Sequence, residues 1–206
     1  MRQEYTNGSL NEKEMPADPL ILFNEWLNFA IEANLTEPNA MTVATSTPDG
    51  KPSMRVLLLK EVNENGFVFF TNYLSRKGRE IKSNPNVAIV FDWHDIERQV
   101  RIEGKAEKLP AHLSDEYFNI RPESAQIGAW ASPQSKIVKD RAELESLEND
   151  ALEQFEDKDV YRPEHWGGYL IKPETIEYWQ GRPSRMHDRI VYYKDEEGWT
   201  MHRLAP

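Results

Sequence analysis

Aromatic and cationic residues are concentrated in the stretch IEYWQGRPSRMHDR, at positions 176–189. Its aromatic half favours a β-strand, the glycine and proline after it indicate a turn, and a second strand is expected to begin at Arg185. Strand alternation would place Arg185, His187 and Arg189 on one face and Met186 on the other. Guanidinium groups beside an imidazole and a tryptophan suit a flat, anionic, heteroaromatic ligand. The alternative is a solvated hairpin whose charges happen to alternate, and periodicity does not decide between the two.

Two pairs of cations occur earlier in the chain. Arg55 and Lys60 are five residues apart on one expected strand, so they should face opposite sides of a sheet and serve different partners, or else reach solvent at the strand ends. Arg76 and Lys77 begin an expected helix, where the backbone dipole makes cations unfavourable. A bound anion would resolve that conflict, and phosphate is the natural candidate.

Composition excludes several classes of function. The net charge of −10 argues against a nucleic-acid partner. No apolar run approaches the roughly 20 residues of a membrane span. The chain has no cysteine, which excludes disulfides and thiolate chemistry and fits a reducing compartment, so a cytoplasmic location is expected. The five histidines show no metal-ligand spacing, and glycine-rich nucleotide loops and a serine-hydrolase elbow are absent.

Hydrophobic patterning predicts a mainly β fold with peripheral helices, of the α+β class. Residues 1–17 read as an arm that is mobile unless something docks on it, and residues 18–206 as one domain. Helices are expected at 18–33, 75–83, 111–120 and 137–156. Strands are expected at 41–47, 53–61, 67–72, 87–93, 97–109, 167–171, 175–180, 185–193 and 199–204. So many hairpin-linked strands favour a closed or nearly closed antiparallel barrel.

The chain resembles the pyridoxine/pyridoxamine 5′-phosphate oxidase family, whose members bind FMN. The resemblance extends over nearly the whole chain, and its most specific part is EYWQG followed by RMHDR, within 177–189. A further matching segment is YFNIRP, followed by QIGAWASPQS. Taken alone, that segment reads as a helix end and a loop. The resemblance implies an FMN-binding split β-barrel, present as a homodimer with two flavins between the subunits.

The family's functional residues carry over position by position. FMN would be held through its phosphate and ribityl chain by Arg55, Thr71, Arg76, Lys77, Gln134 and Ser135, with the neighbouring segment Val56, Leu57, Leu58, Leu59 and Lys60 and with Phe70. Its ring system would contact Gln99, Trp179 and Arg189. The substrate phosphate would be bound by Lys60, Tyr117, Arg121 and the position of Ala125. The substrate ring would be oriented by Arg185, Met186 and His187, with Arg185 and His187 as the catalytic pair and Arg2 and Tyr5 as a lid.

The implied reaction oxidises pyridoxamine 5′-phosphate or pyridoxine 5′-phosphate to pyridoxal 5′-phosphate. Hydride passes from substrate C4′ to flavin N5, and dioxygen is reduced to hydrogen peroxide. Ala125 departs from the usual serine, which puts one phosphate hydrogen bond of about 1 kcal/mol in doubt. Phe70 replaces a frequent tyrosine. Alternatives are another split-barrel flavoprotein, such as a reductase or a haem-degrading relative, and a non-catalytic carrier of flavin or pyridoxal phosphate.

Overall fold

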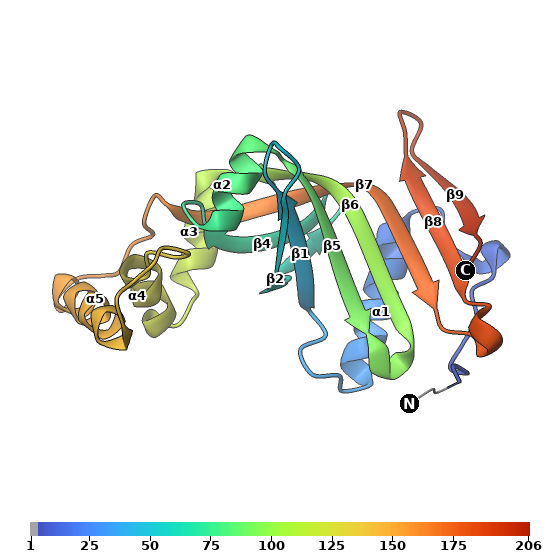
Figure 1. Ribbon diagram of the computed structural model, residues 1–206, viewed down its shortest axis with the longest axis horizontal. Helices are drawn as coiled ribbons and strands as arrows, with labels where there is room; N and C mark the ends of the chain where they lie inside the picture. The colour runs from blue at the N-terminus through green and yellow to red at the C-terminus, as the bar shows by residue number, and fades with distance from the viewer. Residues whose placement is uncertain (1–3) are drawn as a thin grey trace.

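A nine-stranded antiparallel sheet organises the computed structural model, which describes residues 4–206 (Figure 1). The strand order is β2-β1-β5-β6-β7-β4-β3, with β8 joined to β7 and β9 joined to β8. The strands are β1 (Ala40–Ser46), β2 (Pro52–Leu58), β3 (Glu61–Asn63), β4 (Gly66–Asn72), β5 (Asn86–Trp93), β6 (Arg98–Lys108), β7 (Trp166–Gln180), β8 (Asp188–Lys194) and β9 (Trp199–Leu204). The mainly β fold predicted from the sequence is confirmed.

Strand β7 is the longest element of the sheet, with 15 residues. Its first part pairs with β4 and its last part pairs with β8, while β6 runs beside both parts. Two curled arms follow the β6–β7 pair: β5, β1 and β2 continue from β6, and β4 and β3 continue from the first part of β7, while β8 and β9 extend its last part. This is the arrangement expected of a split barrel.

The helices cover the sheet and extend it at one end. They are α1 (Pro19–Glu32), α2 (Arg76–Ser83), α3 (Ala111–Asn119), α4 (Glu123–Ala131) and α5 (Arg141–Gln154), with short 3₁₀ turns at Glu12–Glu14, His94–Ile96 and Pro183–Arg185. Asp18 caps α1 by accepting a hydrogen bond from the Leu20 N–H at 2.9 Å. From α1, the ring of Phe23 packs 4.8 Å from Phe67 and 4.9 Å from Phe91, at the centre of the core.

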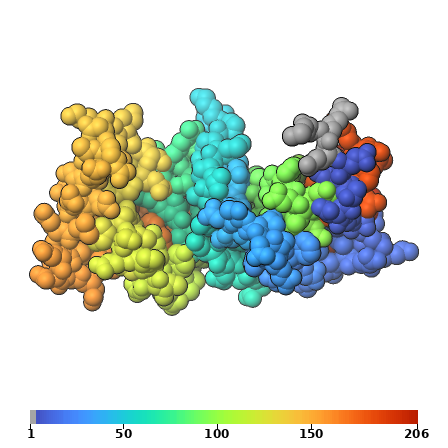
Figure 2. All heavy atoms as spheres, turned by 90° about the horizontal axis from the view of Figure 1, so that it is seen from below, coloured from blue at the N-terminus to red at the C-terminus, as the bar shows by residue number. Residues whose placement is uncertain are grey.

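The molecule is elongated, and its two ends are built differently (Figures 1 and 2). Helices α4 and α5 lie at one end, and the N-terminal arm lies with β8 and β9 at the other. Within residues 4–206, no helix is long and apolar enough to cross a bilayer.

Three expected strands have different limits in the structure. The strand predicted at 53–61 ends at Leu58, and the chain then moves to the other arm of the sheet, where Glu61–Asn63 pairs with β4. The strands predicted at 167–171 and 175–180 form the single strand β7. The pairing with β6 shifts by one residue between Glu103 and Gly104, so Pro173 is accommodated by a bulge instead of ending the strand.

Two local predictions are wrong. Residues 123–131, expected to be a loop, form helix α4. The second strand of the hairpin begins at Asp188 and not at Arg185. Arg185 instead lies in a 3₁₀ turn with φ of 62°, so strand alternation does not place Arg185, His187 and Arg189 on a common face.

The described part of the N-terminal arm lies against the C-terminal strands. The N–H of Leu10 donates to Asp188 Oδ2 at 3.1 Å, and Arg203 pairs with Glu12 at 2.5 Å. The side chain of Leu10 is buried in the main core. Residues 4–17 are thus docked on the domain, while their expected role as a lid remains a prediction.

Candidate active site

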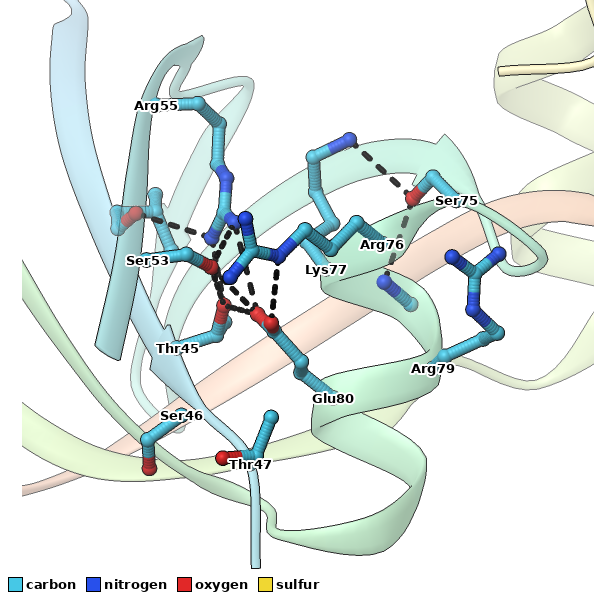
Figure 3. A network of polar contacts seen from close by, with 12 residues as sticks. Thr45, Ser46, Thr47, Ser53, Arg55, Ser75, Arg76, Lys77, Arg79 and Glu80 are labelled. Atoms are coloured by element: carbon cyan, nitrogen blue, oxygen red, sulfur yellow. Dashed lines mark hydrogen bonds and ion pairs between the residues drawn. The ribbon is translucent and has the colours of Figure 1, made fainter. Parts of the chain in front are cut away.

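Two arginines converge on one carboxylate between β2 and α2, and a lysine of the same helix points instead toward Ser75 (Figure 3). We call this group the cation cluster: Arg55, Arg76, Lys77 and Glu80. The guanidinium of Arg55 donates to Thr45 Oγ1 and to Ser53 Oγ, both at 2.6 Å, and lies 3.6 Å from the Glu80 carboxylate. Arg76 Nε donates to the same carboxylate at 2.8 Å. The separate predictions for Arg55 and for Arg76 and Lys77 therefore concern one site.

Glu80 was not predicted from the sequence. Its side chain is buried and accepts short hydrogen bonds from Thr45 and Ser53, at 2.5 and 2.6 Å. Burial opposes ionisation, but the hydrogen bonds from Ser53, Thr45 and Arg76 outweigh it and hold the pKa of Glu80 at about 2. The four-residue spacing from Arg76 is the sequence signal that could have identified this pair.

Lys77 is the most buried cation of the cluster. Its Nζ donates to Gln134 Oε1 at 2.8 Å, to Thr71 Oγ1 at 3.1 Å and to Ser75 Oγ at 3.3 Å. These partners are all uncharged, so burial and then the charge of Arg55 lower the pKa of Lys77 to about 8. Gln134 comes from the loop after α4, and its neighbour Ser135 has a left-handed backbone, with φ of 68°.

The cation cluster fits the phosphate of a nucleotide cofactor. Three cations and one carboxylate leave a net charge of about +2, which a phosphate dianion of about −2 would balance. The Ser75 side chain accepts from the Gly78 N–H at the start of α2, where the helix dipole also favours an anion. An anion at this position would give Lys77 the charged partner that it lacks.

A second group joins aromatic rings to an arginine. Phe70, Tyr117 and Trp166 are stacked, with ring centroids 3.9 Å apart for Phe70 and Tyr117 and 5.5 Å apart for Phe70 and Trp166. The guanidinium of Arg121 lies 4.5 Å from the Trp166 ring centre. Its Nη1 is buried without a hydrogen-bond partner within residues 4–206, and burial lowers the pKa of Arg121. An unpaired guanidinium nitrogen is suited to a bound anion.

The turn between α3 and α4 is held by one amide side chain. Gln126 Nε2 donates to the carbonyl oxygens of Phe118, Asn119 and Arg121, at 3.1, 3.4 and 3.0 Å. Ala125 lies beside it in the first turn of α4, and its methyl group cannot donate to a ligand. The side chain of Lys60 is exposed, while its N–H is fixed to Val68 O at 2.9 Å.

A third group lies where β7 ends and contains the predicted catalytic histidine. The imidazole of His187 is 4.8 Å from the Trp179 ring, and Tyr5 lies 5.6 and 5.7 Å from these two rings. His187 Nδ1 accepts a hydrogen bond from the Arg182 N–H at 3.1 Å. In neutral His187 the proton is therefore on Nε2, which can donate to a ligand.

The other predicted ring contacts lie near this group. Gln99, Trp179 and Arg189 are direct partners across β6, β7 and β8. The Arg189 guanidinium makes two hydrogen bonds to the buried Glu177 carboxylate, at 2.8 and 3.1 Å. Met186 is 67% exposed, so most of its side chain is not packed against other described residues. Arg2, the other expected lid residue, lies outside the described residues.

The predicted site residues are therefore divided between two ends of one chain. Arg121 packs on Trp166 at the start of β7, and the cation cluster reaches the same end through Thr71, which pairs with Gly167. His187 packs on Trp179, thirteen residues further along the same strand. At about 3.3 Å per residue, that separation is about 40 Å along β7. One chain does not bring the two halves of the site together.

Comparison with known proteins gives the same family for the whole chain. Residues 27–147 match the family model described as pyridoxamine 5′-phosphate oxidase, and residues 166–206 match the pyridoxine 5′-phosphate oxidase C-terminal dimerisation region. Curated relatives named pyridoxine/pyridoxamine 5′-phosphate oxidase include those of Burkholderia multivorans and Pseudomonas paraeruginosa, which are 52% and 51% identical. Both alignments cover 100% of this chain and 97% of the relative.

Solved structures show the same fold. PhzG from Burkholderia lata, in complex with tetrahydrophenazine-1-carboxylic acid, superposes with a TM-score of 0.89 at 30% identity and covers 96% of this chain and 98% of its own. A pyridoxamine 5′-phosphate oxidase-related FMN-binding protein from Nostoc punctiforme has a TM-score of 0.72 at 17% identity, covering 93% and 100%. With full-length relatives at about half identity, the chain belongs to the pyridoxine/pyridoxamine 5′-phosphate oxidase family.

Proposed function

We propose that the protein oxidises pyridoxamine 5′-phosphate and pyridoxine 5′-phosphate to pyridoxal 5′-phosphate with FMN as cofactor. Bound FMN supplies the redox chemistry, taking hydride from substrate C4′ at N5 and passing two electrons to dioxygen to give hydrogen peroxide. With the amine substrate, water enters and ammonia leaves. The observation that carries the proposal is the presence of two separate cationic groups, the cation cluster and Arg121, each of which could bind one phosphate.

The cation cluster is the proposed site of the FMN phosphate. Lys77 and the two arginines would bind the phosphate oxygens, with Thr71, Gln134 and Ser135 around them. The ring system would lie against Gln99, Trp179 and Arg189. Glu177 fixes the Arg189 guanidinium through two hydrogen bonds, so this contact is oriented before the cofactor arrives.

The aromatic group with Arg121 is the proposed site of the substrate phosphate. Arg121 Nη1 is buried and has no partner within residues 4–206, Tyr117 stacks on Phe70 in the same group, and Lys60 would supply a second cation. Because Ala125 provides no hydroxyl, we expect weaker phosphate binding than with serine, by about fivefold for one hydrogen bond of about 1 kcal/mol.

Arg185 and His187 are proposed to align the substrate ring and to steady charge that develops as hydride leaves. The His187 Nε2–H is available as a donor because Nδ1 is occupied by the Arg182 N–H. Tyr5 packs against both His187 and Trp179, so the arm is placed to exclude water from this face.

A homodimer would complete the site, with FMN at the subunit interface. The two halves lie about 40 Å apart along β7, which is much longer than the substrate. A two-fold dimer can bring the Arg121 end of one chain to the His187 end of its partner, and would form two equal sites. The match of residues 166–206 to a dimerisation region supports this arrangement.

Anaerobic mixing of the FMN-loaded protein with pyridoxamine 5′-phosphate tests the proposal. We expect the visible flavin absorbance to bleach, and to recover in air with formation of aldehyde and peroxide. A non-catalytic carrier would hold FMN without bleaching. If neither phosphorylated vitamer bleached the bound flavin, the proposed substrates would be wrong.

A further inference from the structure

A pocket outside the proposed active site lies between α2, the end of β6 and β7. Its cavity volume is 340 Å³, within the range of small-molecule sites. Gly78 and Ile81 line it from α2, whereas Lys77 and Glu80 of the same helix belong to the cation cluster. The pocket and the cation cluster are therefore separate sites that share one helix.

Two lysines without carboxylate partners line this pocket. Neither Lys82 nor Lys108 makes an ion pair within residues 4–206, and Lys108 Nζ lies 3.8 Å from the centre of the Tyr73 ring. Lysines nearby on the same strands are paired: Lys105 with Glu174 at 2.8 Å and Lys172 with Glu107 at 2.6 Å. No acidic residue is among the described residues that line the pocket, although the chain carries a net charge of −10.

The hydroxyl group of Tyr169 adds a neutral donor to the two cations. Tyr169 is only 2% exposed, and its ring packs against Phe69 and Tyr73, with centroids 5.5 and 5.2 Å apart. Its hydroxyl group makes no hydrogen bond to the described chain, and its side chain lines the pocket. Burial raises the pKa of Tyr169 to about 12, so the hydroxyl keeps its proton at neutral pH. Because this hydroxyl group is not among the fully buried polar atoms, it is open to the pocket and can donate to an acceptor there.

The remaining wall is apolar. Leu74, Ile81 and Ala106 contribute aliphatic surface, and Leu74 is 56% exposed. We propose that this pocket binds a small carboxylate with an apolar body. The carboxylate would meet Lys82, Lys108 and the Tyr169 hydroxyl, and the body would cover the aliphatic wall. This site does not depend on the proposed oxidase chemistry.

Calorimetric titration of the FMN-loaded protein with 2-naphthoate tests the proposal. We expect saturable binding of one probe per chain. The neutral analogue 2-naphthalenemethanol should bind at least about tenfold more weakly, because it lacks the charge that the lysines and the hydroxyl group recognise. Equal binding of the two probes, or no saturable binding of 2-naphthoate, would overturn the proposal.

Variants locate the probe. Lys108→Met and Lys82→Met should each weaken 2-naphthoate binding by about two- to fivefold, as expected for exposed cations. Tyr169→Phe should weaken it about tenfold, and retained FMN together with an unchanged melting temperature would show that this variant is folded. Lys172→Met is the matched control, because Lys172 is paired with Glu107 and does not line the pocket.

A last variant separates this pocket from the proposed substrate site. Arg121→Ala should leave 2-naphthoate binding unchanged, since Arg121 does not line the pocket. Loss of binding in Arg121→Ala with full binding in Lys108→Met and Tyr169→Phe would place the probe in the substrate site and contradict the proposal. The readout is probe binding, so it stands whether or not the protein oxidises pyridoxamine 5′-phosphate.

Discussion

Lys77 combines a buried ammonium group with neutral partners. Its pKa of about 8 lies below the ordinary value of 10.5, so the free protein loses this charge as the pH rises through 8. A bound phosphate favours the protonated form and raises the pKa again. FMN affinity is therefore expected to be nearly constant between about pH 7 and pH 8, where the phosphate is already a dianion, and to fall above pH 8 by at most about tenfold per pH unit.

Fluorescence titration of the apoprotein with FMN between pH 6 and about pH 10 checks this dependence. Riboflavin has no phosphate and should show none of the fall, which makes it the control ligand. Lys77→Met should bind FMN more weakly at neutral pH and lose the dependence. The same fall in Lys77→Met would assign the titration to another group.

Glu80 holds two arginines through a buried carboxylate. Glu80→Gln removes the charge that faces Arg55 and Arg76, and we expect unfolding free energy at neutral pH to decrease by about 2 kcal/mol. The pKa of Glu80 in the folded state is about 2, below its ordinary value of 4.5. Its stabilisation is therefore complete above pH 4.5 and is lost as the pH falls toward 2.

Urea unfolding of the apoprotein measures both effects. Glu174→Gln is the matched control, because Glu174 is 55% exposed and pairs with Lys105 on the surface. That change should alter stability by less than about 0.5 kcal/mol. If Glu80→Gln and Glu174→Gln had the same free energy of unfolding, the charge of the Glu80 carboxylate would not stabilise the cation cluster.

At the scale of elements, the bulge between β6 and β7 depends on one glycine. A Cβ on Gly104 would lie 2.1 Å from Lys172 O, far inside contact distance. We expect Gly104→Ala to destabilise the protein by about 2 kcal/mol because the two strands must separate. In helix α4, a Cβ on Gly128 meets no atom within 4 Å. Gly128→Ala should stabilise the protein by about 0.5–1 kcal/mol through helix propensity. Thermal unfolding should therefore show a lower melting temperature for Gly104→Ala and a higher one for Gly128→Ala.

Most of these elements could be predicted from the sequence because they carry local signals. Asp18 and Pro19 mark the start of α1, and Ser75 marks that of α2. The side chains of Asp18 and Ser75 act as the caps. Alternation and turn residues indicated most of the strands. The oxidase resemblance named the site residues, and the structure groups most of them, although their roles stay predictions.

The elements that could not be predicted depend on tertiary contacts. Helix α4 contains Gly128 and lacks a side-chain cap, and it is held by burial of Ile127 and Ala129. Pro173 reads as the end of a strand, but its missing N–H is tolerated where the pairing slips beside Gly104. Glu80 is placed among its partners by the contact of α2 with β1 and β2, which no local pattern contains.

For the molecule as a whole, the division of the site along β7 predicts complementation between two inactive variants. Arg121→Ala damages one half-site and His187→Ala damages the other. If the site is shared, a mixed dimer has one intact site, formed by the undamaged half of each chain. An equal mixture, after subunits are exchanged, should recover about a quarter of the wild-type activity.

The measurement is the oxidase rate of the two variants before and after joint refolding. Mixing Arg121→Ala with a second variant of the same half-site, Tyr117→Ala, is the control and should recover nothing. Recovery limited to the sum of the separate activities would show that each chain carries its own complete site.

The length of β7 also decides how a defective chain affects a normal one. If the site is shared between subunits as proposed, a chain damaged at one end leaves a mixed dimer with one working site, so activity falls only in proportion to the damaged chains. A chain damaged at both ends inactivates both sites of the mixed dimer, although its normal partner is intact. Mutations at one end alone would thus lower activity only in proportion to the amount of mutant chain. The combination of both in one chain would be dominant-negative.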